Sequence, residues 1–116
     1  MTAEELAART GAKLLHPGLA TRPIERVYAG DRMSDLLNHA SDATLVVTNL
    51  TTSQLVRAAA LMDLAGLCLV NGVEPEAALL DAAASSGTAL MVSPHDLFAA
   101  CGRLYECFHT ERQAVR

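Results

Sequence analysis

Three stretches of the 116-residue chain repeat one pattern, in which an apolar run is followed by a short polar turn and a helix-like run. The apolar runs span residues 44–48, 66–70 and 88–92. They lack the alternation of a half-exposed strand, which is typical of parallel strands that are buried on both faces. Strands that alternate with helices predict an α/β fold, because parallel neighbours need a crossover connection.

A polar turn follows each apolar run, and a fourth follows an alternating strand expected at residues 24–29. In an open parallel sheet the carboxyl ends of neighbouring strands meet at one edge, and ligands bind there. Asn71-Gly72 is a pair that accepts positive φ. We therefore expect a crevice at this edge, lined by Gly30, Asp31, Ser34, Thr48, Asn49, Asn71, Gly72, Ser93 and His95. Ordinary turn and capping chemistry explains the same residues without a ligand.

Capping signals mark the first helix and the second-last helix. Thr2 and Glu5 have the spacing of a capping box, and Gly11 ends the helix that follows. Pro75 suits the first position of a later helix that Gly87 ends. Shorter elements are expected as a strand at 12–15, a helix at 33–39 and a helix from the Ser53 cap to about Leu64.

The last helix carries a broad apolar stripe. Its N-terminal signals are Ser93 as N-cap, Pro94 at the first position and Asp96 at the third. The helix is expected to end near His109. This wide apolar surface can face the sheet alone or also a second subunit, and in the second case Phe98 and Tyr105 are the candidates for an oligomer interface. The residues of the stripe are Leu97, Phe98, Cys101, Leu104, Tyr105 and Phe108.

Composition indicates one aliphatic domain at residues 1–110, followed by a polar tail at 111–116. Apolar residues make up 51% of the chain, whereas aromatic residues make up 3%. The net charge of −4 and the scattered basic residues disfavour a nucleic-acid partner, whose phosphates require clustered cations. No apolar stretch reaches the roughly 20 residues that span a membrane.

The three cysteines, Cys68, Cys101 and Cys107, are odd in number and lack the CxxC spacing of a disulfide framework or zinc site. Reduced thiols and the absence of a signal-peptide pattern after Met1 predict a cytoplasmic protein. The four histidines lie far apart in sequence, so no metal site or other cofactor is expected.

The sequence contains no P-loop, dinucleotide-binding, GxSxG or HExxH motif. A small enzyme that uses Asp31, Asp35 or His95 for acid–base chemistry is a third-ranked alternative, because no paired carboxylate or nucleophile–base spacing supports it. We therefore expect a non-catalytic protein.

The run Val27-Tyr-Ala-Gly-Asp-Arg-Met-Ser-Asp-Leu36 resembles the V-x-x-G-D-x-x-S-D segment of DRTGG domains. Later segments follow in the family's order: Leu45-Val-Val-Thr48, Val70-Asn-Gly72, Glu74-Pro-Glu76 and Ser93 before the last helix. The string that names the family does not occur contiguously, so the resemblance rests on these segments. It covers nearly the whole chain.

The resemblance implies a fold like the N-terminal domain of HPr kinase. This fold is a three-layer α/β/α sandwich with a mainly parallel sheet of about four or five strands. It also implies a regulatory or assembly module, since the catalytic residues of HPr kinase belong to its other domain. Related domains accompany CBS domains in regulated pyrophosphatases and phosphate acetyltransferases. Standalone copies resemble small proteins encoded near hydrogenase-type redox systems in anaerobic bacteria.

Two functional hypotheses follow. The first is a non-enzymatic regulatory module, expected to be a homodimer, that senses a nucleotide or another anion at the carboxyl edge of the sheet. The second is a protein-interaction subunit of a redox or metabolic complex that binds no small ligand.

Overall fold

The computed structural model describes residues 1–18, 22–30, 43–49, 55 and 63–114, with side chains as far as Thr110. The helix expected at 33–39 lies outside the described residues, and so does most of the helix expected at 53–64. Within that second segment Leu55 is helical and fully buried.

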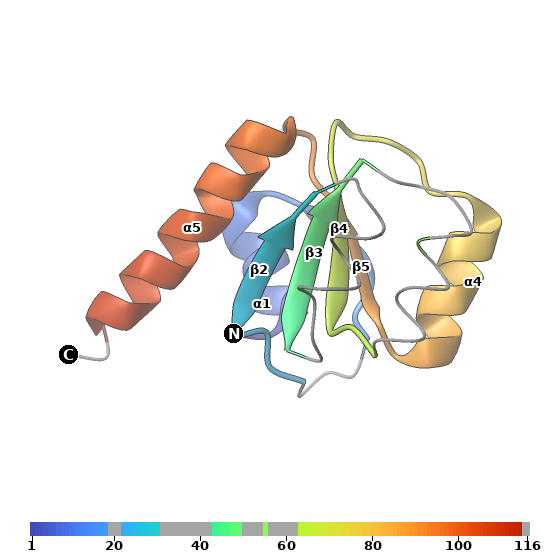
Figure 1. The fold of residues 1–116 in the computed structure, drawn as a ribbon, viewed down its shortest axis with the longest axis horizontal. Coiled ribbons are helices and arrows are strands. Elements are labelled where there is room, and N and C mark those ends of the chain that lie inside the picture. Colours follow the sequence, from blue (N-terminus) through green and yellow to red (C-terminus); the bar gives the residue numbers. More distant parts are fainter. Residues whose placement is uncertain (19–21, 31–42, 50–54, 56–62, 115–116) are drawn as a thin grey trace.

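A five-stranded sheet forms the centre of the protein (Figure 1). Its order is β1-β5-β4-β3-β2. The strands from β2 to β5 pair in parallel, whereas β1 pairs antiparallel with β5. The prediction of a mainly parallel sheet is therefore confirmed. The strands are β1 (Lys13–His16), β2 (Arg26–Ala29), β3 (Thr44–Thr48), β4 (Gly66–Leu69) and β5 (Ala89–Val92).

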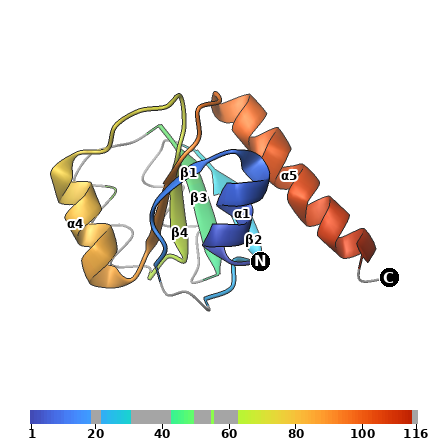
Figure 2. The same cartoon turned by 180° about the vertical axis from the view of Figure 1, so that it is seen from behind.

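Helices cover both faces of the sheet and complete the expected three layers. Helices α1 (Ala3–Thr10) and α5 (Leu97–Ala114) share one apolar cluster with the sheet. Helix α4 (Ala77–Ser86) packs with Leu55 against the opposite face. Figure 2 shows α1 lying over the sheet from behind, with α5 beside it and α4 at the far end.

Side chains line up across the strands in two kinds of row, as the parallel register requires. Val46, Leu67 and Leu90 are register partners and face α4, with half-buried Tyr28 at the end of their row. The alternate row consists of Val47, Cys68 and Met91, which face α1 and α5. Strand β3 is buried along its whole length, which explains why its sequence shows no alternation.

The predicted caps of α1 and the C-terminal stop of α4 are confirmed. The Thr2 side chain accepts a hydrogen bond from the Glu5 N–H, and the Glu5 carboxylate accepts from the Thr2 N–H. The Glu5 carboxylate also accepts from the Thr2 hydroxyl at 3.1 Å, and the bonds from the Thr2 N–H and hydroxyl lower the pKa of Glu5. Gly11 and Gly87 are both left-handed and end their helices, with φ of 75° and 70°.

Both later helices begin after the predicted residues. Asp96, and not Ser93, caps α5, because the Asp96 carboxylate accepts from the Ala99 N–H at 2.8 Å. Ser93 directly follows β5, and its N–H donates to the Leu69 carbonyl of β4, so the sheet pairing keeps Ser93 away from the helix. In α4 the N-cap is Glu76, so Pro75 precedes the helix and does not occupy its first position.

Two further boundaries differ from the sequence prediction. Strand β2 starts at Arg26, and Ile24 packs in the cluster that contains Val27 instead of sharing a face with Tyr28. Alternation cannot place Ile24, because it lies outside the strand. Helix α5 continues to Ala114, beyond the end expected near His109.

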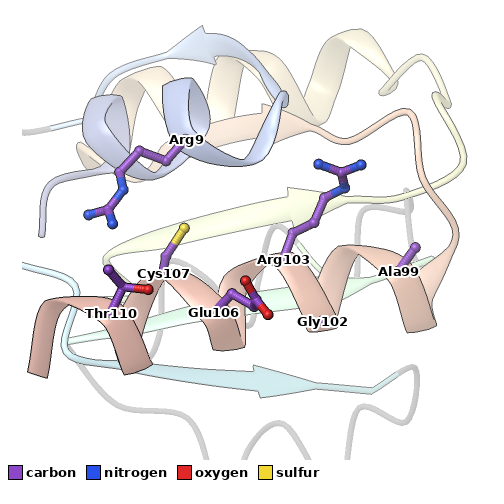
Figure 3. Close-up of a pocket in the computed structure, with 7 residues that line it drawn as sticks. All are labelled: Arg9, Ala99, Gly102, Arg103, Glu106, Cys107 and Thr110. Carbon is purple, nitrogen blue, oxygen red and sulfur yellow. The ribbon is translucent and has the colours of Figure 1, made fainter. Parts of the chain in front are cut away.

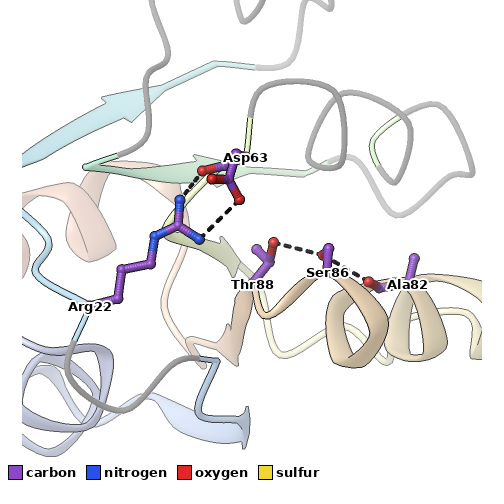
Figure 4. A network of polar contacts seen from close by, with 5 residues as sticks. All are labelled: Arg22, Asp63, Ala82, Ser86 and Thr88. Carbon is purple, nitrogen blue, oxygen red and sulfur yellow. Dashed lines mark hydrogen bonds and ion pairs between the residues drawn. The ribbon is translucent and has the colours of Figure 1, made fainter.

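Polar contacts join loops at the amino edge of the sheet (Figure 4). The Arg22 guanidinium forms an ion pair with Asp63 at 3.3 Å and donates a hydrogen bond to the Asp63 carbonyl. The Ser86 hydroxyl donates to the Ala82 carbonyl at 2.8 Å and lies 2.9 Å from the Thr88 hydroxyl. Because Asp63 is 72% exposed, its ion pair with Arg22 contributes little stability.

Two glycines allow a matched test of these backbone conformations. A Cβ at Gly102, inside α5, or at Gly11 would meet nothing within 4 Å, but only Gly11 is left-handed. We expect Gly102→Ala to raise the free energy of unfolding by roughly 0.5–1 kcal/mol, through helix propensity. Gly11→Ala should lower it by about 1–2 kcal/mol. Urea unfolding curves measure both, and equal effects of the two substitutions would contradict this account.

Candidate functional site

The turns after β3, β4 and β5 meet at the carboxyl edge of the sheet and are hydrogen-bonded to one another. The Asn71 side-chain amide donates to the Asn49 side chain at 3.0 Å. The Asn71 N–H donates to the His95 carbonyl at 2.7 Å, and the Gly72 N–H donates to the Ser93 carbonyl at 2.8 Å. We call these five residues the ledge. Asn71 and Gly72 both have φ of 62°, which confirms the expectation of positive φ.

Contacts within the protein use much of the ledge's hydrogen-bonding capacity. The Ser93 N–H donates to the Leu69 carbonyl, and the Ser93 hydroxyl accepts from the His95 N–H at 3.2 Å. The amides of Asn71, Gly72, Ser93 and His95 therefore all bond inside the protein. The Asp96 carboxylate also occupies the start of α5, where an anion would otherwise be favoured. This arrangement makes the ledge a rigid wall.

Of the remaining predicted residues, Gly30 and Thr48 lie at the ends of the paired strands β2 and β3, and the others lie outside the described part of the chain. Gly30 extends the β2–β3 pairing through its N–H, which donates to the Val47 carbonyl at 3.0 Å. Thr48 is fully buried at the end of β3. Asp31, Ser34 and the alternative acid–base residue Asp35 lie outside the described residues. A ligand-binding role for Gly30, Asp31, Ser34 and Thr48, and an acid–base role for Asp35, stay predictions.

A groove of about 590 Å³ adjoins the ledge and opens beside α4. Gly72 belongs to both features, and Pro94 continues the groove wall next to Ser93. Its lining is mostly aliphatic, with one cation, Lys13, and one carboxylate, Glu74. Such a composition is typical of small-molecule sites. The groove is lined by Gly11, Lys13, Leu15, Gly72, Val73, Glu74, Pro75, Leu80, Val92 and Pro94.

Sequence reasoning missed most of this groove, because it did not place β1 beside β5. Lys13 pairs with Val92 in the antiparallel register, which brings the start of β1 to the carboxyl edge. Val73 and Pro75 directly follow the predicted Asn71-Gly72 turn, so the sequence did carry a signal for that wall.

The predicted interface residues of α5 are the most exposed large apolar side chains among the described residues. Phe98 is 84% exposed and Tyr105 is 71% exposed. Tyr105 stacks on His109, with ring centroids 6.0 Å apart. Leu104 is buried, and Leu97, Cys101 and Phe108 pack against the core. The predicted stripe therefore divides into a sheet-facing part and an exposed part.

The cysteines behave as core residues. Burial raises the pKa of the Cys68 thiol to about 12; the nearby Cys101 thiol adds to the rise, and a hydrogen bond with the Ser93 backbone opposes it. Burial also raises the pKa of Cys101. Among the described residues, no group of three or more His, Cys, Asp or Glu side chains is placed to hold a metal ion.

Cys68 should therefore resist alkylation in the native protein. At pH 8 its thiolate fraction is more than about a thousand-fold below that of a free cysteine, because only the thiolate reacts. We expect iodoacetamide to modify the Cys68 peptide slowly in buffer and rapidly in urea, as measured by mass spectrometry. Native labelling as fast as labelling of the unfolded chain would contradict the burial of this thiol.

None of the helices in the described part of the chain combines the length and the apolar character that a membrane span requires.

Comparison with models of known protein families found no match, and neither did comparison with curated proteins. Comparison with solved structures found the crystal structure of the CBS and DRTGG domains of the regulatory region of Clostridium perfringens pyrophosphatase, in complex with its activator diadenosine tetraphosphate. The TM-score is 0.75 at 13% sequence identity.

The alignment covers 89% of this chain and 45% of the pyrophosphatase chain, so this protein spans less than half of that regulatory region. At this identity the likeness concerns the fold. The chain therefore has an α/β fold like that of this CBS and DRTGG domain region, which agrees with the α/β class that the sequence predicted.

Proposed function

We propose that the protein is a non-catalytic regulatory module that binds a nucleotide or a related anionic small molecule in the groove beside the ledge. The observation that carries the proposal is the position of this groove, at the carboxyl edge of a parallel sheet and next to three interlocked turns. Open α/β sheets bind ligands at this edge. The shared fold with a regulatory region that binds diadenosine tetraphosphate supports the same choice.

The lining of the groove suits a ligand with one flat apolar part and one anionic part. Val73, Val92 and Leu80 provide aliphatic surface for a base, and Lys13 provides the cation for a phosphate. The volume of about 590 Å³ is within the usual range of roughly 300–1,000 Å³ for small-molecule pockets. The rigid ledge holds Gly72 in place, so the wall is preformed.

A thermal-shift experiment tests this site with diadenosine tetraphosphate, ATP and AMP as probes. Saturating ligand should raise the melting temperature by several degrees, since a ligand at 100 times its Kd stabilises by about 2.7 kcal/mol. Leu80→Glu should abolish the shift by placing a carboxylate in the groove. Ala78→Glu is the matched control, because Ala78 is exposed on the same helix and does not line the groove.

The control variant should keep the full shift. The proposal fails if none of the three nucleotides shifts the wild-type protein, or if Leu80→Glu and Ala78→Glu respond alike.

A second candidate function is protein association through α5, in a homodimer or with a protein partner. It is favoured by the exposure of Phe98 and Tyr105, because large apolar side chains that are so exposed are typical of contact surfaces. This candidate needs no small ligand.

Sedimentation measurements over a range of protein concentration test the association. Phe98→Glu and Tyr105→Glu should each convert an oligomer into a folded monomer, since a buried unpaired carboxylate is costly. Ala84→Glu, at an exposed position of α4, should leave the oligomer intact. A wild-type protein that remains monomeric at high concentration would remove the main support for this candidate.

A further inference from the structure

A second groove lies on the opposite face of the sheet, between α1 and α5. Its volume is about 530 Å³. Small residues form part of its α5 side, where Ala99 and Gly102 leave room between the helices. The other lining residues are Arg9, Arg103, Glu106, Cys107 and Thr110.

Two arginines from different helices line this one groove. Figure 3 shows Arg9 extending from α1, and Arg103 and Cys107 extending from α5, into the space between the two helices. With Glu106 as the one carboxylate of the lining, the groove has a formal charge of +1 on a chain whose net charge is −4. The groove is therefore a local exception to the acidic character of the protein.

The two arginines differ in their contacts. The Arg9 guanidinium lies 3.2 Å from the Met1 sulfur and takes part in a further polar contact, so Arg9 contributes mainly its charge. The Arg103 side chain is exposed and forms no hydrogen bond or ion pair within the part of the chain that the structure describes. The Arg22 guanidinium, by contrast, forms an ion pair with Asp63. Arg103 thus keeps its planar set of donors for an external group.

We infer that the groove between α1 and α5 binds an oxyanion of a small ligand, with Arg103 as the main contact. A guanidinium binds carboxylate or phosphate through two parallel hydrogen bonds. Arg9 adds attraction from the other side, and the Thr110 hydroxyl offers a further donor along α5. The volume leaves room for a small organic group beyond the anion. The site is separate from the groove beside α4 and does not depend on its proposed function.

Titration of the ¹⁵N-labelled protein with inorganic phosphate and with succinate, at constant ionic strength, tests the inference. Saturable shifts should be centred on residues 99–110 of α5. Arg103→Gln should raise the Kd about tenfold or more, which corresponds to loss of a charge-assisted bidentate contact. Gly102→Met should have a similar effect, because its side chain fills the groove while favouring helix.

Lys13→Gln is the matched control, since it removes the same charge from the groove beside α4. It should leave the Kd for phosphate and succinate unchanged. Equal weakening by Arg103→Gln and Lys13→Gln, or shifts that do not saturate, would overturn the inference. A response to one anion alone would support it and identify the anion class. Failure here leaves the nucleotide shifts of the other groove unaffected, so the two proposals fail separately.

Discussion

The in-register pairing of the parallel strands is the constraint on which the rest of the structure depends. Val46, Leu67 and Leu90 align on one face of the sheet, and Val47, Cys68 and Met91 align on the other. A slip of one residue in any strand would exchange the two faces. Full burial of an aliphatic side chain contributes roughly 1.5–3 kcal/mol, so these rows fix the register strongly. The register in turn brings the polar turns to a common edge.

At the carboxyl edge of the sheet, the residues of the ledge fix the shape of the site, whereas other residues supply the groups that would contact a ligand. Asn71 bonds His95 through backbone groups, and Ser93 bonds Gly72 through its carbonyl and His95 through its hydroxyl. These contacts determine where the neighbouring walls lie. The side chains that would contact a ligand come from other residues of the groove, such as Lys13 and Val73. A residue can therefore be essential to a site's shape without touching a ligand.

Apolar runs and helix caps made part of the fold predictable from the sequence. The apolar runs located β3, β4 and β5 to within one residue at each end, and the capping box of Thr2 and Glu5 located α1. The start of α5 was not predictable in this way, because Ser93 and Asp96 are both good caps and only the pairing of β5 excludes Ser93.

The groove beside α4 was only partly predictable from the sequence, because part of it also depends on contacts between distant segments. The polar turns indicated the correct edge of the sheet, and Gly72 is common to the predicted crevice and the observed groove. Part of the wall depends on long-range arrangement, since Lys13 and Leu15 reach it through an antiparallel pairing that no local pattern specifies. The groove between α1 and α5 likewise depends on how two helices that are distant in sequence pack together.

The antiparallel strand β1 has a consequence for the order in which the chain folds. Lys13 pairs with Val92, so β1 can join the sheet only after most of the chain has been brought together. Closing such a long loop costs chain entropy before any contact compensates it, which places this step late in folding. Strand β1 lies at the edge of the sheet and is followed by the turn in which Gly18 approaches Ala89 closely. Both grooves take part of their walls from the segment of α1 and β1, so neither groove is complete until this segment has joined the sheet.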